Sequence, residues 1–401
     1  PAAYYRLSRF KPAIYRFVLG SVDREHGVTS NNKNKGPAMT ARFHNPVDTR
    51  FGWGSLQELA SLTEHQTVAL VTFPEARALG LVDRLQDLLG DRLVYVIEDV
   101  QPNPDVAQLR GTYERFWQEA GECHAVIAVG GGSAIDTAKA LIVGTESGRF
   151  DELLALLATG KPFVPAHSKV LIAAPTTAGT GSEVTPWATI WDSANHKKYS
   201  LHLDCTWPKV AIVDPELMLT VPGGVTVSTG LDALSHALES VWNINANPVS
   251  DTFAISAIAD ILECLPLLRR DLSNKELRSR MALAALKAGL AFSNTKTALA
   301  HSISYEMTLH YGLPHGIACS FTLPLVLGLA WGHDQARDRT LQSIFGHDLP
   351  KAQARLRDFL HNLDVKTEFA DYGVTAKDAE AMIGFALQGA RGKNFIGSQA
   401  A

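Results

Sequence analysis

The sequence lacks the features that mark secreted, membrane-spanning and polyanion-binding proteins. It has only four cysteines in 401 residues, and they lie far apart and form no C-x-x-C pair. That pattern favours the reducing cytoplasm and argues against a disulfide framework or a thiolate metal site. Charged residues make up 19% of the chain and the net charge is −4, so no nucleic-acid partner is expected.

Long hydrophobic runs are also missing. The most apolar stretch, residues 316–332, is interrupted by Pro324 and is shorter than the roughly 20 residues that a membrane-spanning helix needs. We expect this stretch to be a buried core helix and expect no membrane contact. With 46% hydrophobic residues the chain can bury a substantial core, and its length suggests two domains.

Residues 1–38 differ from the rest of the chain. They follow neither a helical nor a strand period, and they close with the polar tract SNNKNKGP. Met39 then opens a regularly patterned chain. We therefore expect residues 1–38 to be a poorly ordered extension upstream of the natural start.

Apolar strand patterns alternate with amphipathic helix patterns from Thr67 to about Pro222. The strand patterns are TVALVTF, LVYVIEDV, AVIAVGGG, KVLIAAPTT and KVAIVDPEL. Strands this apolar are usually covered on both faces, which predicts a parallel sheet flanked by helices. Beyond Pro222 only helical periods follow. We therefore predict an α/β domain over residues 39–222 and an all-α domain over residues 223–401.

Two loops rich in glycine and small residues follow apolar strands in the first domain. One is Gly130-Gly131-Gly132-Ser133, and the other is TTAGTGS at residues 176–182. Glycines at a strand-to-helix turn let the backbone approach a ligand, and the free amides of the helix N-terminus favour a pyrophosphate. Tight structural turns would give the same pattern, but two such loops favour a dinucleotide-binding domain.

The second domain contains one aspartate and three histidines at spacings typical of a metal site. Asp232 and His236 are four residues apart in TGLDALSHALESVW, so on a helix they project from one face. A solvated polar face is the alternative explanation for that pair alone. His301 lies in an apolar helical stretch, where a buried histidine needs a partner, and His315 follows in LPHG. Three imidazoles and one carboxylate suit Fe²⁺ or Zn²⁺ and leave room for a substrate oxygen, so the all-α domain is expected to bind metal and substrate.

Together these segments resemble the iron-containing (group III) alcohol dehydrogenase family. The matching motifs are GGGSAIDTAKA, PTTAGTGSEVT, VDPEL, TGLDALSHALE and the A-H…P-H-G pair. The resemblance runs from about Phe43 to the C-terminus and implies metal-dependent, NAD(P)H-linked chemistry in a homodimer or larger homo-oligomer. It implies metal ligation by Asp232, His236, His301 and His315. It implies dinucleotide contacts by Gly131, Gly132, Ser133, Asp136, Thr176, Thr177, Thr180, Ser182 and Lys198.

Two positions depart from the pattern of that family. Many members have an aspartate where this chain has Phe73, and no carboxylate follows that strand before Glu75. The choice between NADH and NADPH therefore stays open. Many members also have a second histidine four residues after the position of His301, where this chain has Tyr305. The Tyr305 hydroxyl, His310 or water would then supply the proton.

Stretches outside the shared motifs resemble the phosphonoacetaldehyde reductase branch of the family. They are WNINANPVSD and AFSNTKTALAHSISYEMTLHYGLPHGIACSFTLP. That branch reduces phosphonoacetaldehyde to 2-hydroxyethylphosphonate, so the expected substrate is a small anionic aldehyde. Lys296 and Asn294 lie in a turn before the helix of His301, where a cation and a helix N-terminus suit an anion. We expect Lys296 near the metal, with Arg391 and Lys393 closing over the same anion.

Other substrates and reaction classes are open at this point. A lysine does not distinguish phosphonate from sulfonate or carboxylate, so sulfoacetaldehyde and succinate semialdehyde are alternative substrates. A metal-dependent lyase of the dehydroquinate synthase kind shares the general architecture and would show no net reduction of an aldehyde. A non-catalytic nucleotide- or metal-binding protein is the third alternative.

Overall fold

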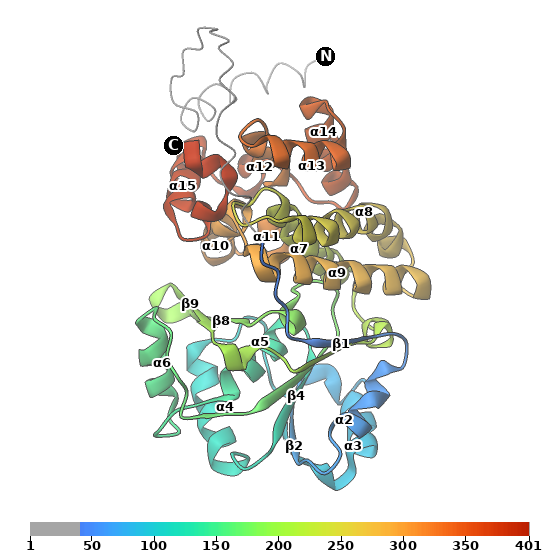
Figure 1. Cartoon of the computed structure of the whole chain (residues 1–401), viewed down its shortest axis with the longest axis vertical. Helices are drawn as coiled ribbons and strands as arrows, with labels where there is room; N and C mark the ends of the chain where they lie inside the picture. Colours follow the sequence, from blue (N-terminus) through green and yellow to red (C-terminus); the bar gives the residue numbers. More distant parts are fainter. Residues whose placement is uncertain (1–40, 401) are drawn as a thin grey trace.

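The computed structural model describes residues 41–400 and shows two domains (Figure 1). The predicted extension over residues 1–38 lies outside this range. The α/β domain is the lower half of Figure 1, and the helical domain is the upper half, with α9 (Lys275–Thr295) running along its lower side. The predicted fold class is confirmed, because a parallel sheet with flanking helices is followed by helices alone.

Six parallel strands form the sheet of the first domain. Their order is β1-β10-β7-β4-β2-β3, and every neighbouring pair is parallel. All five strands predicted between Thr67 and Pro222 are present, and β1 forms an edge strand. The bounds are β1 Asp48–Phe51, β2 Val68–Val71, β3 Leu93–Ile97, β4 Ala125–Gly130, β7 Val170–Pro175 and β10 Val210–Val213.

Both faces of this sheet are covered, as the uniformly apolar strands predict. In β4, Val126 and Ala128 pack into one core cluster, whereas Ile127 and Val129 pack into another. Successive side chains of a strand point to opposite faces, so each cluster lies on its own side of the sheet. The helices of the first cluster are α4 (Val106–Glu119), α5 (Gly132–Leu141) and α6 (Phe150–Ala158), and those of the second are α2 (Leu59–Leu62) and α3 (Leu81–Leu89).

A β-hairpin that the sequence patterns do not predict follows the second glycine-rich loop. Strands β8 (Trp187–Asp192) and β9 (Lys197–His202) pair antiparallel, and β8 packs against α5. The hairpin mixes aromatic, polar and charged residues without a strict alternation, so the usual strand signal is weak. A second, very short pair joins β5 (Val143–Gly144) to β6 (His167–Ser168).

The helical domain is built around α7 (Gly223–Val241). This helix packs against α8, α9 and α11, and residues 230–241 are all buried. One large apolar cluster unites the domain. The other helices are α8 Pro248–Arg270, α10 Leu299–Tyr311, α11 His315–Ser320, α12 Leu323–Ala330, α13 Gln335–Phe345, α14 Leu349–Asn362 and α15 Ala376–Gln388.

The apolar stretch of residues 316–332 is buried as predicted, but it forms two helices. α11 ends at Ser320 and α12 begins at Leu323, with Pro324 in its first turn. Proline lacks the amide hydrogen needed inside a helix, so it favours a new start over a continuous helix. Within residues 41–400, no helix has the length and apolarity needed to cross a bilayer.

The two domains touch where two glycines meet. Gly181, in the second glycine-rich loop, has φ +61°, and a Cβ there would lie 2.6 Å from the Cα of Gly289 in α9. Only glycine permits this backbone conformation and this approach together. Asn45 adds a link, since its Nδ2 donates to the carbonyl of Val184 beside that loop and to Oγ of Ser293 in α9. The loop is thus held against the helical domain.

Candidate active site

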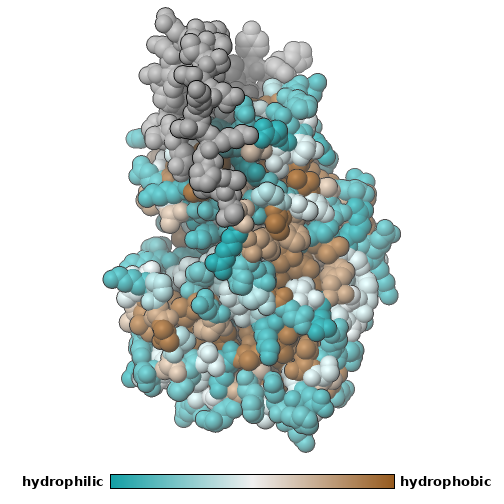
Figure 2. Space-filling view, viewed as in Figure 1, coloured by the Kyte–Doolittle hydropathy of each residue, from teal (hydrophilic) through white to brown (hydrophobic). Residues whose placement is uncertain are grey.

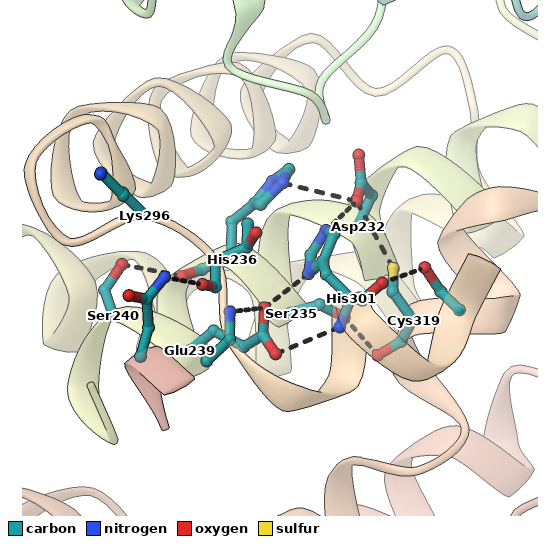
Figure 3. A network of polar contacts seen from close by, with 12 residues as sticks. Asp232, Ser235, His236, Glu239, Ser240, Lys296, His301 and Cys319 are labelled. Atoms are coloured by element: carbon teal, nitrogen blue, oxygen red, sulfur yellow. Dashed lines mark hydrogen bonds and ion pairs between the residues drawn. The ribbon is translucent and has the colours of Figure 1, made fainter. Parts of the chain in front are cut away.

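The four predicted metal ligands lie together where α7, α10 and α11 meet. The Nε2 atoms of His301, His315 and His236 lie 3.3, 3.7 and 3.8 Å from Oδ1 of Asp232. Figure 3 shows His236 and His301 turned toward Asp232. An ion bound about 2.0–2.2 Å from each donor atom separates neighbouring donors by roughly 3–3.5 Å. The spacing of these four side chains is therefore close to that of a preformed metal shell.

Burial excludes a solvated polar face for α7. Asp232 is 3% exposed and His236 is 6% exposed. The opposite stripe of the helix is buried as well, so α7 has protein on both sides. A carboxylate in such a place needs a compensating positive charge. The structure thus places the aspartate and its imidazoles where a divalent cation would satisfy them.

The electrostatics of the cluster suit cation binding. Burial opposes ionisation of Asp232, but His236, His301 and His315 hold its pKa well below its usual range. Burial lowers the pKa of His236 to about 4 and that of His315 to about 3, despite the nearby carboxylate. At neutral pH the cluster therefore offers a carboxylate and the neutral imidazoles of His236 and His315, which are ligands for Fe²⁺ or Zn²⁺. Burial opposes the charged form of His301, but Glu239 and Asp232 outweigh it and raise its pKa.

Glu239 supports His301, and sequence reasoning gave it no role. Its Oε2 lies 2.6 Å from Nδ1 of His301 and accepts from the amide of Ala298, and its Oε1 accepts from the amide of His301. A carboxylate on Nδ1 fixes the proton there and turns Nε2 toward the cluster. The signal was available, because Glu239 lies seven residues after Asp232 on the same helical stripe.

Replacing Glu239 with glutamine should weaken metal binding without removing any ligand. We expect the dissociation constant for a divalent ion to rise about 10–100-fold, the usual effect of losing such a supporting carboxylate. Titration of the metal-free protein against a chromogenic chelator measures it. Glu306→Gln, on the surface of α10, is the matched control. Equal affinities of the two variants would contradict the role of Glu239.

His236 is held in a different way. Its Nδ1 is buried and has no hydrogen-bond partner within residues 41–400. Instead its ring stacks on Phe292 at 4.0 Å and on His301 at 4.5 Å between centroids, with interplanar angles of 12° and 17°. The stack continues through Trp187 to His202 in the hairpin. His236 is therefore oriented mainly by ring packing, with the backbone of Gly179 nearby, whereas His301 is fixed by hydrogen bonds.

Cys319 joins the cluster, although the cysteine spacing argued against a thiolate metal site. Its Sγ lies 3.5 Å from Oδ1 of Asp232 (Figure 3). One donor atom each from Asp232, His301, His315 and Cys319 lies within 4.8 Å of the others. The thiol is thus a further candidate ligand in this cluster.

The two glycine-rich loops lie side by side at the carboxyl ends of β4 and β7. The amide of Thr176 donates to the carbonyl of Gly130, and a Cβ on Gly132 would lie 2.6 Å from Cγ2 of Thr180. Ligands of open parallel sheets bind at this edge. Gly131, Gly132, Ser133, Thr177 and Thr180 keep partial exposure there.

Other predicted cofactor residues hold the loops in place. Asp136 accepts from Ser182 Oγ at 2.7 Å and from the amide of Thr189 at 2.9 Å. Lys139 donates to the carbonyl and hydroxyl oxygens of Ser182 and to the carbonyl of Trp187, and burial lowers its pKa to about 8. Asp136 and Ser182 therefore join α5 to the second loop.

A pair of cations lies beside Tyr305. Lys198 Nζ is 3.9 Å and Arg391 Cζ is 4.7 Å from the centre of the tyrosine ring. Burial and the charge of Arg391 lower the pKa of Lys198 well below its usual value, and burial lowers that of Arg391 to about 10. Neither cation has a carboxylate partner among the described residues, and the buried hydroxyl of Tyr305 has no partner there either.

Several other predicted residues lie apart from this pair. Lys296 is exposed, adopts φ +66°, and points away from the metal cluster in Figure 3. Asn294 is engaged with the backbone of His44, to which it both donates and accepts. His310 is exposed and pairs with Glu306 at 3.2 Å. Lys393 is exposed.

Comparisons with known proteins agree with this geometry. Residues 46–215 match the family model "Iron-containing alcohol dehydrogenase", and residues 226–398 match "Fe-containing alcohol dehydrogenase family, C-terminal". An NAD-dependent methanol dehydrogenase of Bacillus methanolicus is 36% identical over 355 residues, which are 85% of this chain and 91% of that protein.

Two solved structures extend the comparison. The sulfoacetaldehyde reductase from Bifidobacterium kashiwanohense in complex with NAD⁺ has a TM-score of 0.81 and 31% identity, covering 89% of this chain and 95% of that one. A 1,3-propanediol oxidoreductase has a TM-score of 0.76 and 26% identity, covering 90% of this chain and 100% of that one. The named substrates of these relatives differ in charge, so the fold alone does not determine the substrate.

Proposed function

The chain belongs to the family of iron-containing alcohol dehydrogenases, and from this premise we propose that it reduces a small anionic aldehyde to the primary alcohol. Iron, with Zn²⁺ as the alternative metal, and NADH or NADPH are the proposed cofactors. Membership of this family disfavours the dehydroquinate synthase-like lyase. We propose that residues 39–222 bind the dinucleotide and that residues 223–401 bind the metal and the substrate. The proposed assembly is a homodimer or larger homo-oligomer.

The observation that supports an anionic substrate is the pair of cations Lys198 and Arg391 beside Tyr305. Two cations that are close together and partly buried repel each other. Asp136 and Asp232 favour the charged form of Lys198, and Glu239 favours that of Arg391, but none of these carboxylates forms an ion pair with either cation within residues 41–400. Such a pair is stabilised by an anion, and a guanidinium binds a tetrahedral or planar oxyanion through parallel hydrogen bonds. Lys198 also remains the proposed dinucleotide contact, so it would face both ligands.

The residues of the cluster fit a divalent ion. Asp232, His236, His301 and His315 would hold it, and Glu239 would keep His301 in the productive tautomer. Such an ion polarises the aldehyde oxygen, and a nicotinamide supplies the hydride. Gly131, Gly132, Thr177 and Thr180 would carry the dinucleotide, and Ser133 and Thr176 would flank it.

Tyr305 is the proposed proton donor. Its buried hydroxyl has no partner in residues 41–400, and the two cations beside its ring favour a negative charge on the oxygen once the proton leaves. His310 is exposed and already paired with Glu306, so it is the less suitable donor. Water remains the alternative route.

Phosphonoacetaldehyde is the proposed substrate, with 2-hydroxyethylphosphonate as product. A phosphonate carries up to two charges, which suits two neighbouring cations better than a carboxylate does. Support for the anionic class also comes from the neighbour that reduces sulfoacetaldehyde. Sulfoacetaldehyde is therefore the next candidate, followed by succinate semialdehyde.

A panel of aldehydes tests this proposal. We expect kcat/KM for phosphonoacetaldehyde to exceed that for propanal by on the order of 10²-fold, since a charge-assisted contact contributes about 1.5–3 kcal/mol. Sulfoacetaldehyde, succinate semialdehyde and propanal are assayed alongside it with NADH and with NADPH. Equal rates for charged and neutral aldehydes would contradict the anion site. Absence of steady cofactor oxidation with every aldehyde would favour the lyase or the non-catalytic binding protein.

A further inference from the structure

The metal cluster contains one more donor atom than the proposed ligand set uses. His315 and Cys319 are four residues apart at the two ends of α11, so both side chains lie on the face turned toward α7. The Cys319 thiol is buried, and its Sγ lies 3.5 Å from Oδ1 of Asp232. Donor atoms of Asp232, His301, His315 and Cys319 all lie within 4.8 Å of one another.

We propose that Cys319 is a conditional metal ligand that gives this cluster two coordination sets. Asp232, His301 and His315 are common to both sets. A thiophilic ion such as Zn²⁺ takes Cys319 as its fourth ligand, whereas Fe²⁺ takes His236. Soft thiolate sulfur selects zinc over harder ions, which supplies the chemical basis of the choice.

His236 and Cys319, the two alternative ligands, are held in place by different contacts. His236 lies outside the group of four donor atoms that are within 4.8 Å of one another, and its ring is held by stacking on Phe292, so it is the ligand that Cys319 can replace. The backbone of Cys319 is tied to α7, because Ser235 Oγ donates to its carbonyl. The thiol itself is within reach of two acceptors, Asp232 Oδ1 and the Gly316 carbonyl, each at 3.5 Å. It can therefore turn toward an ion without a backbone shift.

The exchange has a chemical balance and a functional consequence. The Sγ–H bond breaks, the Sγ–metal bond forms, and the proton leaves to solvent, with no change in oxidation state. The two sets differ in the charge of the fourth ligand, because a thiolate is anionic and an imidazole is neutral. If the proposed reductase function holds, the form bound through Cys319 is the less active one, since an anionic ligand weakens polarisation of the aldehyde oxygen.

Cobalt substitution tests the ligand directly. Co²⁺ replaces Zn²⁺ and gives an intense near-ultraviolet charge-transfer band only when a thiolate binds it. We expect the band in the metal-free protein loaded with Co²⁺, its loss in Cys319→Ser, and its retention in Cys264→Ser, whose thiol is buried in α8. Competition between Zn²⁺ and Fe²⁺ should show the zinc preference of Cys319→Ser lowered at least about tenfold.

Thermal unfolding will show whether Cys319→Ser folds. If it does not fold, a second variant tests the same ligand. Serine at positions 123, 205 and 264 leaves Cys319 as the only cysteine of the chain, and this triple variant should retain the cobalt band. A cobalt form without a thiolate band, or a band unchanged in folded Cys319→Ser, overturns the inference. These spectra need no substrate, so their outcome is separate from that of the aldehyde panel.

Discussion

Replacement of His301 with alanine is expected to abolish both metal binding and aldehyde reduction. His301 contributes a nitrogen 3.3 Å from Asp232 Oδ1 and is the partner of the fully buried Glu239. Loss of the ion removes several kcal/mol of stabilisation from the developing alkoxide, so kcat/KM should fall by on the order of 10³-fold or more. Metal content by mass spectrometry and turnover of the aldehyde measure the two effects.

The same change should lower stability, because it removes the imidazole that contacts both buried carboxylates, Asp232 and Glu239. A broken buried pair typically costs about 3–5 kcal/mol in free energy of unfolding, which denaturant titration of the metal-free proteins would detect. His310→Ala, on the same helix but exposed, is the control that should keep metal and fold. Full turnover by His301→Ala would instead support a site that does not use the cluster.

Replacement of Arg391 with methionine is expected to remove most of the preference for anionic aldehydes. Methionine keeps much of the apolar stem and discards the charge beside Tyr305. We expect the ratio of kcat/KM for phosphonoacetaldehyde to that for propanal to fall about 10–100-fold, the effect of losing one charge-assisted contact. Arg391→Lys should restore part of the ratio, since lysine supplies charge without the paired donors of the guanidinium.

Lys296→Met distinguishes an anion site at Arg391, which the structure supports, from one at Lys296, which the sequence suggests. Reasoning from the sequence placed Lys296 at the anion, whereas the structure shows it exposed and turned away from the cluster. We therefore expect Lys296→Met to leave the preference close to that of the unaltered protein. A collapse of the preference in Lys296→Met with none in Arg391→Met would return the anion site to the turn that contains Lys296.

Hydrophobic residues gather near the middle of the face drawn in Figure 2, over both domains, and hydrophilic residues surround them. The two features that define chemistry, the metal cluster and the cations beside Tyr305, are assembled from buried and partly buried side chains. The substitutions above address those two features.

Sequence patterns determined the strands, the order of the domains and the identity of the four proposed metal ligands. Uniformly apolar strands report burial on both faces, so β2, β3, β4, β7 and β10 were predictable from composition and length. The β8–β9 hairpin was not predictable in this way, because its polar and aromatic residues do not alternate regularly. They contact α5 and α10 instead. The break between α11 and α12 was marked by Pro324, but only the structure showed that it ends one helix and begins another.

Tertiary structure alone decided which side chains support and which surround the ligands. Periodicity describes the faces of one helix, and it showed that Asp232 and His236 share a side. It cannot show that both sides of α7 are buried, that Glu239 meets His301 across 62 residues, or that Cys319 meets Asp232 across 87. It also cannot bring Lys198 and Arg391 to the same tyrosine. These contacts join different helices and strands, and their formation depends on how the elements pack rather than on the pattern within any one of them.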